Sequence, residues 1–166
     1  MSFKDMPKLG FGLMRLPEKD GAIDVETVQK MVDAYMGNGF NYFDTAYVYH
    51  GGNSEWAVKE ALVARYPRED FYLATKLPAW VMKVPEDRDR IFEEQLKRCG
   101  VEYFDFYLLH SLEDGNNYDT YEKYDCFQWA MEKKEKGQIR HFGFSYHGSP
   151  ELLEQVLLSQ LKIGKH

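Results

Sequence analysis

The sequence predicts an α/β fold of the parallel (β/α) TIM-barrel type, and three observations support this prediction. Short apolar segments begin at positions 8, 40, 71, 104 and 139, so successive segments start 31 to 35 residues apart. Segments with the apolar spacing of helices separate them. Polar side chains suited to chemistry follow the apolar segments, where a barrel builds its active site. We therefore expect one domain, residues 1–166, that forms a truncated barrel of about five βα units.

The apolar segments are the predicted strands. Aromatic residues are frequent in them, and polar residues rarely alternate with apolar ones. This pattern is typical of parallel strands that are buried on both faces. The predicted strands span residues 8–16, 40–46, 71–77, 104–110 and 139–145.

The segments between the strands are predicted helices, at residues 25–39, 54–66, 86–100, 121–138 and 149–166. One face of the first helix carries Val25, Val28, Met31, Val32 and Tyr35. Asp24 and Ser54 stand where helix N-caps are expected. Glycines that can end a helix precede three of the strands, namely Gly39, Gly100 and Gly137.

A second parallel architecture, the doubly wound dinucleotide-binding sheet, fits the sequence less well. That fold places the pattern G-x-G-x-x-G in its first strand-to-helix turn. Here Gly10 and Gly12 are followed by Arg15 at the third glycine position, and Pro17 stands in the loop beyond. The pattern fails, so the barrel is the better prediction.

The composition indicates a globular protein and excludes two classes of partner. Of the 166 residues, 44% are hydrophobic and 29% charged, and the formal net charge is −6. This acidic balance argues against general binding to nucleic-acid phosphates, which requires clustered Lys and Arg. No segment approaches the roughly 20 apolar residues of a membrane span, and the N-terminus lacks the apolar core of a signal peptide. We expect a cytoplasmic protein without a metal site, with Cys99 and Cys126 as free thiols.

Polar residues occupy the same relative place in successive predicted units. Asp44 stands near the end of the second strand, and Tyr49 lies in the loop after it. Lys76 ends the third strand, His110 the fourth and Ser145 the fifth. Each residue alone has a structural explanation, as a turn former, a packing residue, a solvated charge or a helix cap. Their shared placement favours one active site at the carboxyl ends of the strands.

Together these residues suit a reaction in which a carbonyl oxygen gains a proton. A tyrosine has an ordinary pKa of about 10, and a neighbouring ammonium lowers it by stabilising the phenolate. Lys76 would supply that charge to Tyr49, and Asp44 would hold the ammonium in place. His110 would donate a hydrogen bond to the substrate oxygen. Carbonyl reduction is such a reaction, and its hydride must come from a cofactor.

Five segments of the sequence resemble the successive motifs of the aldo-keto reductases. They are LGFGLMRLP, FDTAYVYHGGNSE, YLATKLP, DFYLLH and IRHFGFSYH, and the resemblance runs from residue 8 to residue 157. The family resembled consists of (β/α)8 barrels that use NADP(H) or NAD(H) without a Rossmann motif. The resemblance therefore implies a small carbonyl substrate, an aldehyde or a ketone, and it favours NADP(H) over NAD(H) as the cofactor.

The resemblance also implies roles for individual residues. Tyr49 is the expected general acid/base, Lys76 and Asp44 are its tuning pair, and His110 orients the carbonyl. Trp80 is the candidate residue of the substrate loop. Tyr146 stands where the family often has Asn, so only Ser145 is expected to bond the nicotinamide carboxamide in the usual way. The implied cofactor-binding residues are Gly12, Leu13, Asp44, Ser145 and Tyr146.

The chain is shorter than the roughly 250 residues of a complete barrel. The resemblance ends in the fifth unit, so the parts that grip most of the cofactor in the family are expected to be missing. Open edges on the first and fifth strands predict either self-association or pairing with a complementing C-terminal fragment. Two alternatives to an active reductase stay open: a non-catalytic, regulatory or partner-binding barrel fragment, and an inactive product of a truncated gene.

Overall fold

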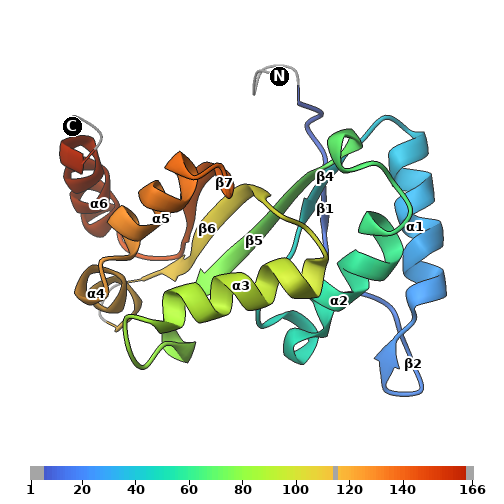
Figure 1. Ribbon diagram of the computed structural model, residues 1–166, viewed down its shortest axis with the longest axis horizontal. Coiled ribbons are helices and arrows are strands. Elements are labelled where there is room, and N and C mark those ends of the chain that lie inside the picture. The colour runs from blue at the N-terminus through green and yellow to red at the C-terminus, as the bar shows by residue number, and fades with distance from the viewer. Residues whose placement is uncertain (1–5, 114–115, 164–166) are drawn as a thin grey trace.

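The computed structural model describes residues 6–113 and 116–163. Its main sheet has five parallel strands in the order β1 (Gly10–Gly12), β4 (Tyr42–Asp44), β5 (Tyr72–Pro78), β6 (Phe104–Leu112) and β7 (Ile139–Tyr146). The strands cross the middle of the molecule in Figure 1, with β1 towards the right and β7 towards the left. This sheet confirms the predicted parallel β/α fold.

Helices connect consecutive strands of the sheet, as parallel pairing requires. They are α1 (Val25–Gly37), α2 (Asn53–Val58) continued by a π-helical turn (Lys59–Val63), α3 (Asp87–Cys99), α4 (Asn116–Lys123), α5 (Cys126–Glu135) and α6 (Pro150–Ile163). Helix α3 lies in front of the sheet in Figure 1, and α1 and α6 lie at opposite ends of the molecule. Short 3-10 helices span Tyr49–Gly52, Arg68–Asp70 and Ala79–Val81.

A small hairpin between β1 and α1 is absent from the sequence-based prediction. It consists of β2 (Glu18–Lys19) and β3 (Ala22–Ile23), which pair antiparallel. The turn residues Asp20 and Gly21 have φ values of 53° and 80°. Two left-handed residues are the geometry of a tight hairpin turn, and the Asp-Gly pair is its usual sequence signal.

The first strand and the second helix begin and end differently from the prediction. The first strand spans Gly10–Gly12 only, because Leu13 and Leu16 leave the sheet and enter the core, where they are 1% and 6% exposed. Ser54 is not an N-cap, since α2 begins one residue before it. Its hydroxyl instead donates to the Leu13 carbonyl oxygen, at 2.9 Å.

The other expected helix ends agree better with the structure. Asp24 caps α1, where its side chain accepts a hydrogen bond from the Thr27 backbone N–H. Gly100 ends α3 in the left-handed conformation. The predicted helix 121–138 is divided, because Asp125 has a φ of 50° and separates α4 from α5.

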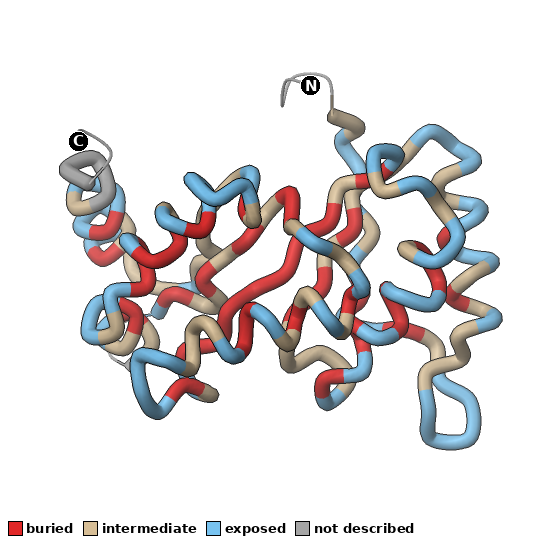
Figure 2. The backbone as a smooth tube through the Cα atoms, in the orientation of Figure 1, coloured by how far each residue is buried: buried red, intermediate tan, exposed pale blue. Residues whose placement is uncertain are grey.

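Buried apolar side chains fill the space between the sheet and its helices. Phe43, Leu73 and Tyr107 are 0% exposed on that face. Figure 2 shows buried residues concentrated along the strands and exposed residues on the outer sides of the helices. Successive strand residues point to opposite faces, and on the other face Tyr42 and Phe106 are partly exposed, with ring centroids 5.3 Å apart.

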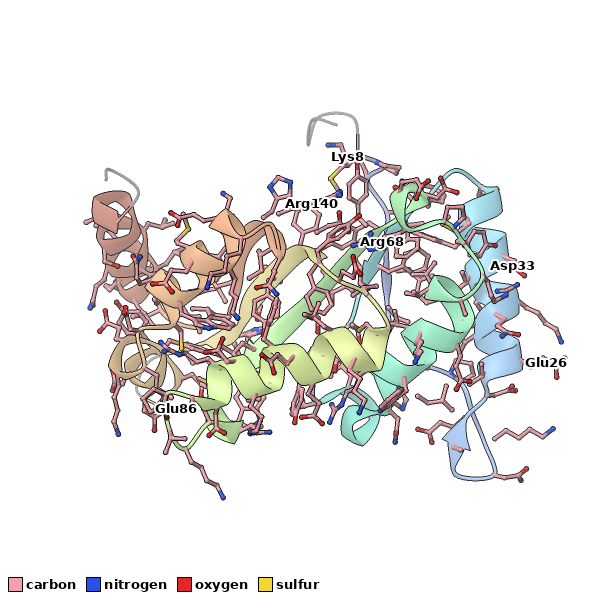
Figure 3. All side chains as sticks on the ribbon, viewed as in Figure 1. Lys8, Glu26, Asp33, Arg68, Glu86 and Arg140 are labelled. Atoms are coloured by element: carbon pink, nitrogen blue, oxygen red, sulfur yellow. The ribbon has the colours of Figure 1, made fainter. Side chains whose placement is uncertain are left out.

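Ion pairs and a hydrogen bond made by Asp105 connect the amino-terminal ends of the strands. Asp105 is 1% exposed and accepts hydrogen bonds from Arg68 at 2.6 Å, Arg140 at 3.1 Å and the Leu73 backbone N–H at 2.9 Å. Figure 3 shows Arg68 and Arg140 near each other at this end of the sheet. The cluster is remote from the carboxyl ends of the strands, so we assign it to stability.

Three further features bear on the expectations from composition. Cys99 and Cys126 are both buried and free. Within residues 6–113 and 116–163, no helix is long and apolar enough to cross a lipid bilayer. The same residues contain no group of His, Cys, Asp or Glu arranged to hold a metal ion.

Candidate active site

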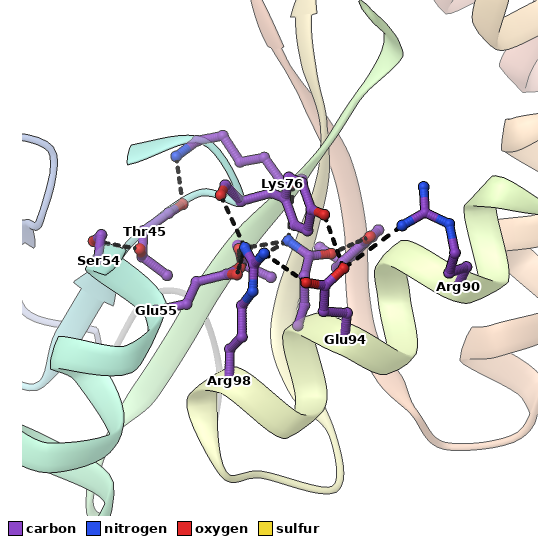
Figure 4. A network of polar contacts seen from close by, with 11 residues as sticks. Thr45, Ser54, Glu55, Lys76, Arg90, Glu94 and Arg98 are labelled. Carbon is purple, nitrogen blue, oxygen red and sulfur yellow. Dashed lines mark hydrogen bonds and ion pairs between the residues drawn. The ribbon is translucent and has the colours of Figure 1, made fainter. Parts of the chain in front are cut away.

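Lys76 is the centre of a polar cluster at the carboxyl ends of β4 and β5. Its ammonium donates to Asp44 Oδ1 at 2.6 Å, to the Thr45 carbonyl oxygen at 2.8 Å and to the Tyr49 hydroxyl oxygen at 3.1 Å. Figure 4 shows the lysine chain reaching towards Thr45. The side chain is only 5% exposed, and the three acceptors match the three protons of an ammonium. The structure thus brings Asp44, Tyr49 and Lys76 together.

The loop that presents Tyr49 is held by the residue after it. His50 has a φ of 51°, and Gly51 and Gly52 continue the left-handed turn that leads into α2. The imidazole Nε2 of His50 accepts from the Leu16 backbone N–H at 2.9 Å. This contact joins the loop to the segment after β1, a role that the sequence did not reveal.

His110 lies beside Tyr49, with the two ring centroids 5.8 Å apart. Burial lowers the pKa of His110 to about 4, and the charge of Lys76 and the nearby His147 add to the effect. The imidazole is therefore neutral near pH 7. Among the described residues its buried Nδ1 has no hydrogen-bond partner. A buried polar atom without a partner is unusual and is consistent with a ligand site.

Trp80 packs beside His110. The indole is 52% exposed, and its ring lies 5.1 Å from the imidazole. It belongs to the short helix Ala79–Val81 that follows β5. Trp80 thus lies directly after β5 and beside His110, and its role in a substrate loop stays a prediction.

Tyr121 contacts the segment that carries Trp80, and sequence reasoning missed this residue. Its fully buried hydroxyl lies 2.7 Å from both the Leu77 and the His110 carbonyl oxygens. It also accepts from the Ala79 backbone N–H at 3.0 Å. Helix α4 thereby ties the ends of β5 and β6 to the Trp80 segment. A tyrosine on the apolar face of a helix was the only signal for this contact.

Gly12 and Leu13, two of the residues that the sequence predicts as cofactor-binding, lie at the end of β1 beside Asp44. Gly12 pairs with Asp44 in the sheet, and the Leu13 N–H donates to the Asp44 carbonyl oxygen at 2.8 Å. The Leu13 side chain points into the core and is 1% exposed. A side chain added at Gly12 would meet no described atom within 4 Å, so there is open space beside this backbone.

Ser145 and Tyr146 lie at the end of β7, next to the strand that carries His110. The Ser145 hydroxyl oxygen accepts from the Ser111 backbone N–H at 2.7 Å. Because it accepts in that bond, the hydroxyl keeps its own proton for donation to an amide oxygen. The Tyr146 hydroxyl donates to the Ser149 carbonyl oxygen, within its own loop. Neither residue belongs to the Lys76 hydrogen-bond cluster described above.

The model of the aldo/keto reductase family matches residues 8–164. Among curated proteins, an aldo-keto reductase from Mycolicibacterium smegmatis is 29% identical, over 92% of this chain and 50% of its own length. An NAD(P)H-dependent D-xylose reductase from Hypocrea jecorina is 30% identical, over 95% of this chain and 53% of its own length. The chain thus spans about half the length of the curated relatives it matches.

Solved structures give the same result for the fold. The holo form of an aldo-keto reductase from Bacillus halodurans has a TM-score of 0.72 and 28% identity, over 90% of this chain and 49% of its own. An aldo-keto reductase from Klebsiella pneumoniae in complex with NADPH has a TM-score of 0.64 and 25% identity, over 84% of this chain and 45% of its own. The family match, the relatives and the shared fold agree, and this chain belongs to the aldo-keto reductase family of oxidoreductases.

Proposed function

We propose that the chain takes part in the NAD(P)H-dependent reduction of aldehyde or ketone carbonyls, with Tyr49 as the general acid. The observation that carries this proposal is the 3.1 Å hydrogen bond between the Lys76 ammonium and the Tyr49 hydroxyl. The same ammonium is held by Asp44. A pseudoenzyme or a partner-binding fragment has no chemical need for a buried lysine that faces a tyrosine.

The reaction divides into two transfers to the carbonyl group. When bound, the nicotinamide cofactor supplies a hydride to the carbonyl carbon. Tyr49 gives its hydroxyl proton to the carbonyl oxygen, so that an alcohol forms and a phenolate remains. The adjacent Lys76 ammonium stabilises that phenolate, and neutral His110 donates an N–H to the carbonyl oxygen and orients it.

The residues present fit one part of such a cofactor. Open space lies beside Gly12, and the Ser145 hydroxyl can donate to a carboxamide oxygen. The unpartnered Nδ1 of His110 supports a ligand between these elements. We propose NADP(H) as the preferred form, because a related structure from Klebsiella pneumoniae was solved with NADPH.

The proposal is tested with the full chain, a set of aldehydes and ketones, and NADPH or NADH in parallel. Wild type is expected to oxidise the cofactor only when a carbonyl is present, and faster with NADPH than with NADH. Tyr49→Phe should abolish turnover while cofactor binding, measured by fluorescence titration, stays within about twofold. Equal loss of binding and turnover would assign Tyr49 to structure instead.

We further propose association of the chain with a second copy through the terminal strands β1 and β7. The partly exposed sheet face around Tyr42 and Phe106 supports this, because in a barrel that face lines the closed interior. A cytoplasmic location is also part of the proposal. It is supported by the free thiols of Cys99 and Cys126, which are usual in a reducing compartment.

A further inference from the structure

A second polar network lies fully buried behind Lys76, between the sheet and the helices. Glu55 of α2, Thr75 of β5 and Gln95 of α3 are each 0% exposed. Glu55 Oε1 accepts from the Thr75 hydroxyl at 2.7 Å and from Gln95 Nε2 at 2.8 Å. Figure 4 shows the side chains of Glu55 and Arg98 meeting, and this ion pair is 3.5 Å long. Burial of a carboxylate costs free energy unless hydrogen bonds or an opposite charge stabilise it, and the proposed reaction does not use this one.

The network ends on the backbone of the strand that carries the lysine. Gln95 Nε2 donates to the Lys76 carbonyl oxygen at 3.0 Å. The orientation of the Gln95 amide is fixed because its Oε1 accepts from the Tyr107 hydroxyl at 2.6 Å. The Lys76 peptide unit is therefore held from the helix side of the sheet, while its ammonium reaches Asp44 and Tyr49.

The residue before Glu55 makes a matching set of contacts. Ser54 Oγ lies 2.7 Å from Thr45 Oγ1 and donates to the Leu13 carbonyl oxygen at 2.9 Å. The Thr45 carbonyl oxygen is itself an acceptor for the Lys76 ammonium. The first turn of α2, which follows the Tyr49 loop directly, thus contacts Thr45, the residue after Asp44, and Thr75, the residue before Lys76.

We propose that Glu55 and Gln95 are positioning residues, which hold the backbone at Thr75 and Lys76 so that the ammonium keeps its place against Tyr49. This inference rests on the proposed carbonyl reduction. A shift of the lysine would slow proton transfer, whereas cofactor and substrate contacts lie on other residues. The expected signature of losing the network is therefore a lower kcat with an unchanged KM.

Two isosteric substitutions in the full chain test this role. Glu55→Gln weakens the acceptor at the centre of the network, and Thr75→Val removes one donor without changing side-chain shape. Both are expected to lower kcat about 10- to 100-fold, with the KM for the carbonyl and the Kd for NADPH within about twofold. Thr75→Ser, which keeps the hydroxyl, and Glu60→Gln, on an exposed residue beyond α2, should match wild type.

A measurement without turnover separates this inference from the proposed function. In NMR of isotopically labelled tyrosine, Tyr49→Phe identifies the ring carbon that bears the Tyr49 hydroxyl. Its resonance should move in Glu55→Gln and Thr75→Val in the direction that it moves in Lys76→Met, and stay in place in Thr75→Ser. An unmoved resonance in either folded test variant overturns the inference. If wild type reduces no carbonyl, the proposed function fails and the resonance alone decides the positioning role.

Discussion

At the residue scale, the proposed chemistry depends on one ammonium with three acceptors. Asp44 and the Thr45 carbonyl oxygen fix the Lys76 ammonium, and the third proton faces the Tyr49 hydroxyl. Charge-assisted hydrogen bonds of this kind are short and directional. Asp44 and Tyr49 are close in the sequence, and both contact Lys76, which lies on the next strand, β5.

Removal of that ammonium should slow the reaction without unfolding the site. We expect Lys76→Met to lower kcat by about 10²- to 10⁴-fold, the range of general acid–base effects, because the phenolate loses its counter-charge. NADPH affinity, measured by fluorescence titration, should change little. Lys97→Met, on an exposed residue of α3, is the matched control. A kcat that falls equally in both variants would contradict the role given to Lys76.

The buried imidazole of His110 predicts a pH dependence of stability. Its pKa falls from 6.5 to about 4 on folding. Below pH 6.5 His110 therefore binds a proton in the unfolded chain, whereas in the folded chain it stays neutral down to about pH 4. The contribution of neutral His110 to the free energy of unfolding is therefore complete above pH 6.5 and is lost as the pH falls from 6.5 to about 4.

Urea unfolding between about pH 4 and pH 7 measures this effect. His110→Gln should flatten the pH dependence of the unfolding free energy across the window. His147→Gln should keep most of it, because burial is the larger cause of the shift. Equal slopes for wild type and His110→Gln would show that another group titrates instead.

At the scale of elements, α4 fastens the ends of two strands through one hydroxyl. Tyr121→Phe should lower the unfolding free energy by about 1 to 3 kcal/mol, because the Ala79 N–H and two carbonyl groups lose a buried partner. Tyr124→Phe is the control, since its hydroxyl bonds the Lys83 carbonyl oxygen at an exposed position. Urea unfolding of both variants checks the difference, and equal losses would remove the special role of Tyr121.

The order and type of the main-sheet strands and of the helices between them could be predicted from the sequence, but the β2–β3 hairpin and several element ends were not. A period of about 32 residues and apolar runs identify the strands, and the residues that follow them identify the Lys76 cluster. The end of β1 depends on where Leu13 turns into the core, and the division of α4 from α5 depends on Asp125. Such features arise from tertiary packing and leave no local pattern.

The contacts that support the site could not be predicted from the sequence, because they too arise from tertiary packing. Glu55 and Gln95 come from different helices, and Tyr121 comes from a third. Nothing in their own neighbourhoods distinguishes them from residues of ordinary amphipathic helices. Only the folded arrangement shows that all three bond the backbone at the carboxyl ends of β5 and β6, directly or through Gln95.

At the scale of the whole molecule, the proposed association rests on the partly exposed sheet face around Tyr42 and Phe106 and on the two terminal strands. Parallel strands with unpaired edges attract further strands. We expect sedimentation of the full chain to show a concentration-dependent dimer, and Tyr42→Lys to weaken it by placing a charge on the sheet face. Glu93→Lys, on the exposed side of α3, is the control. A monomer at all concentrations that binds no exposed-core dye would contradict the proposal.

Transfer of the hydride itself is the most direct test of the central claim. The full chain is mixed with NADPH that carries deuterium at the transferred position and with the carbonyl set, and the products are analysed by mass spectrometry. The account predicts a deuterated alcohol with wild type and none with Tyr49→Phe. Cofactor binding without any deuterated product, or equal product from both proteins, would contradict the assignment of carbonyl reduction to this site.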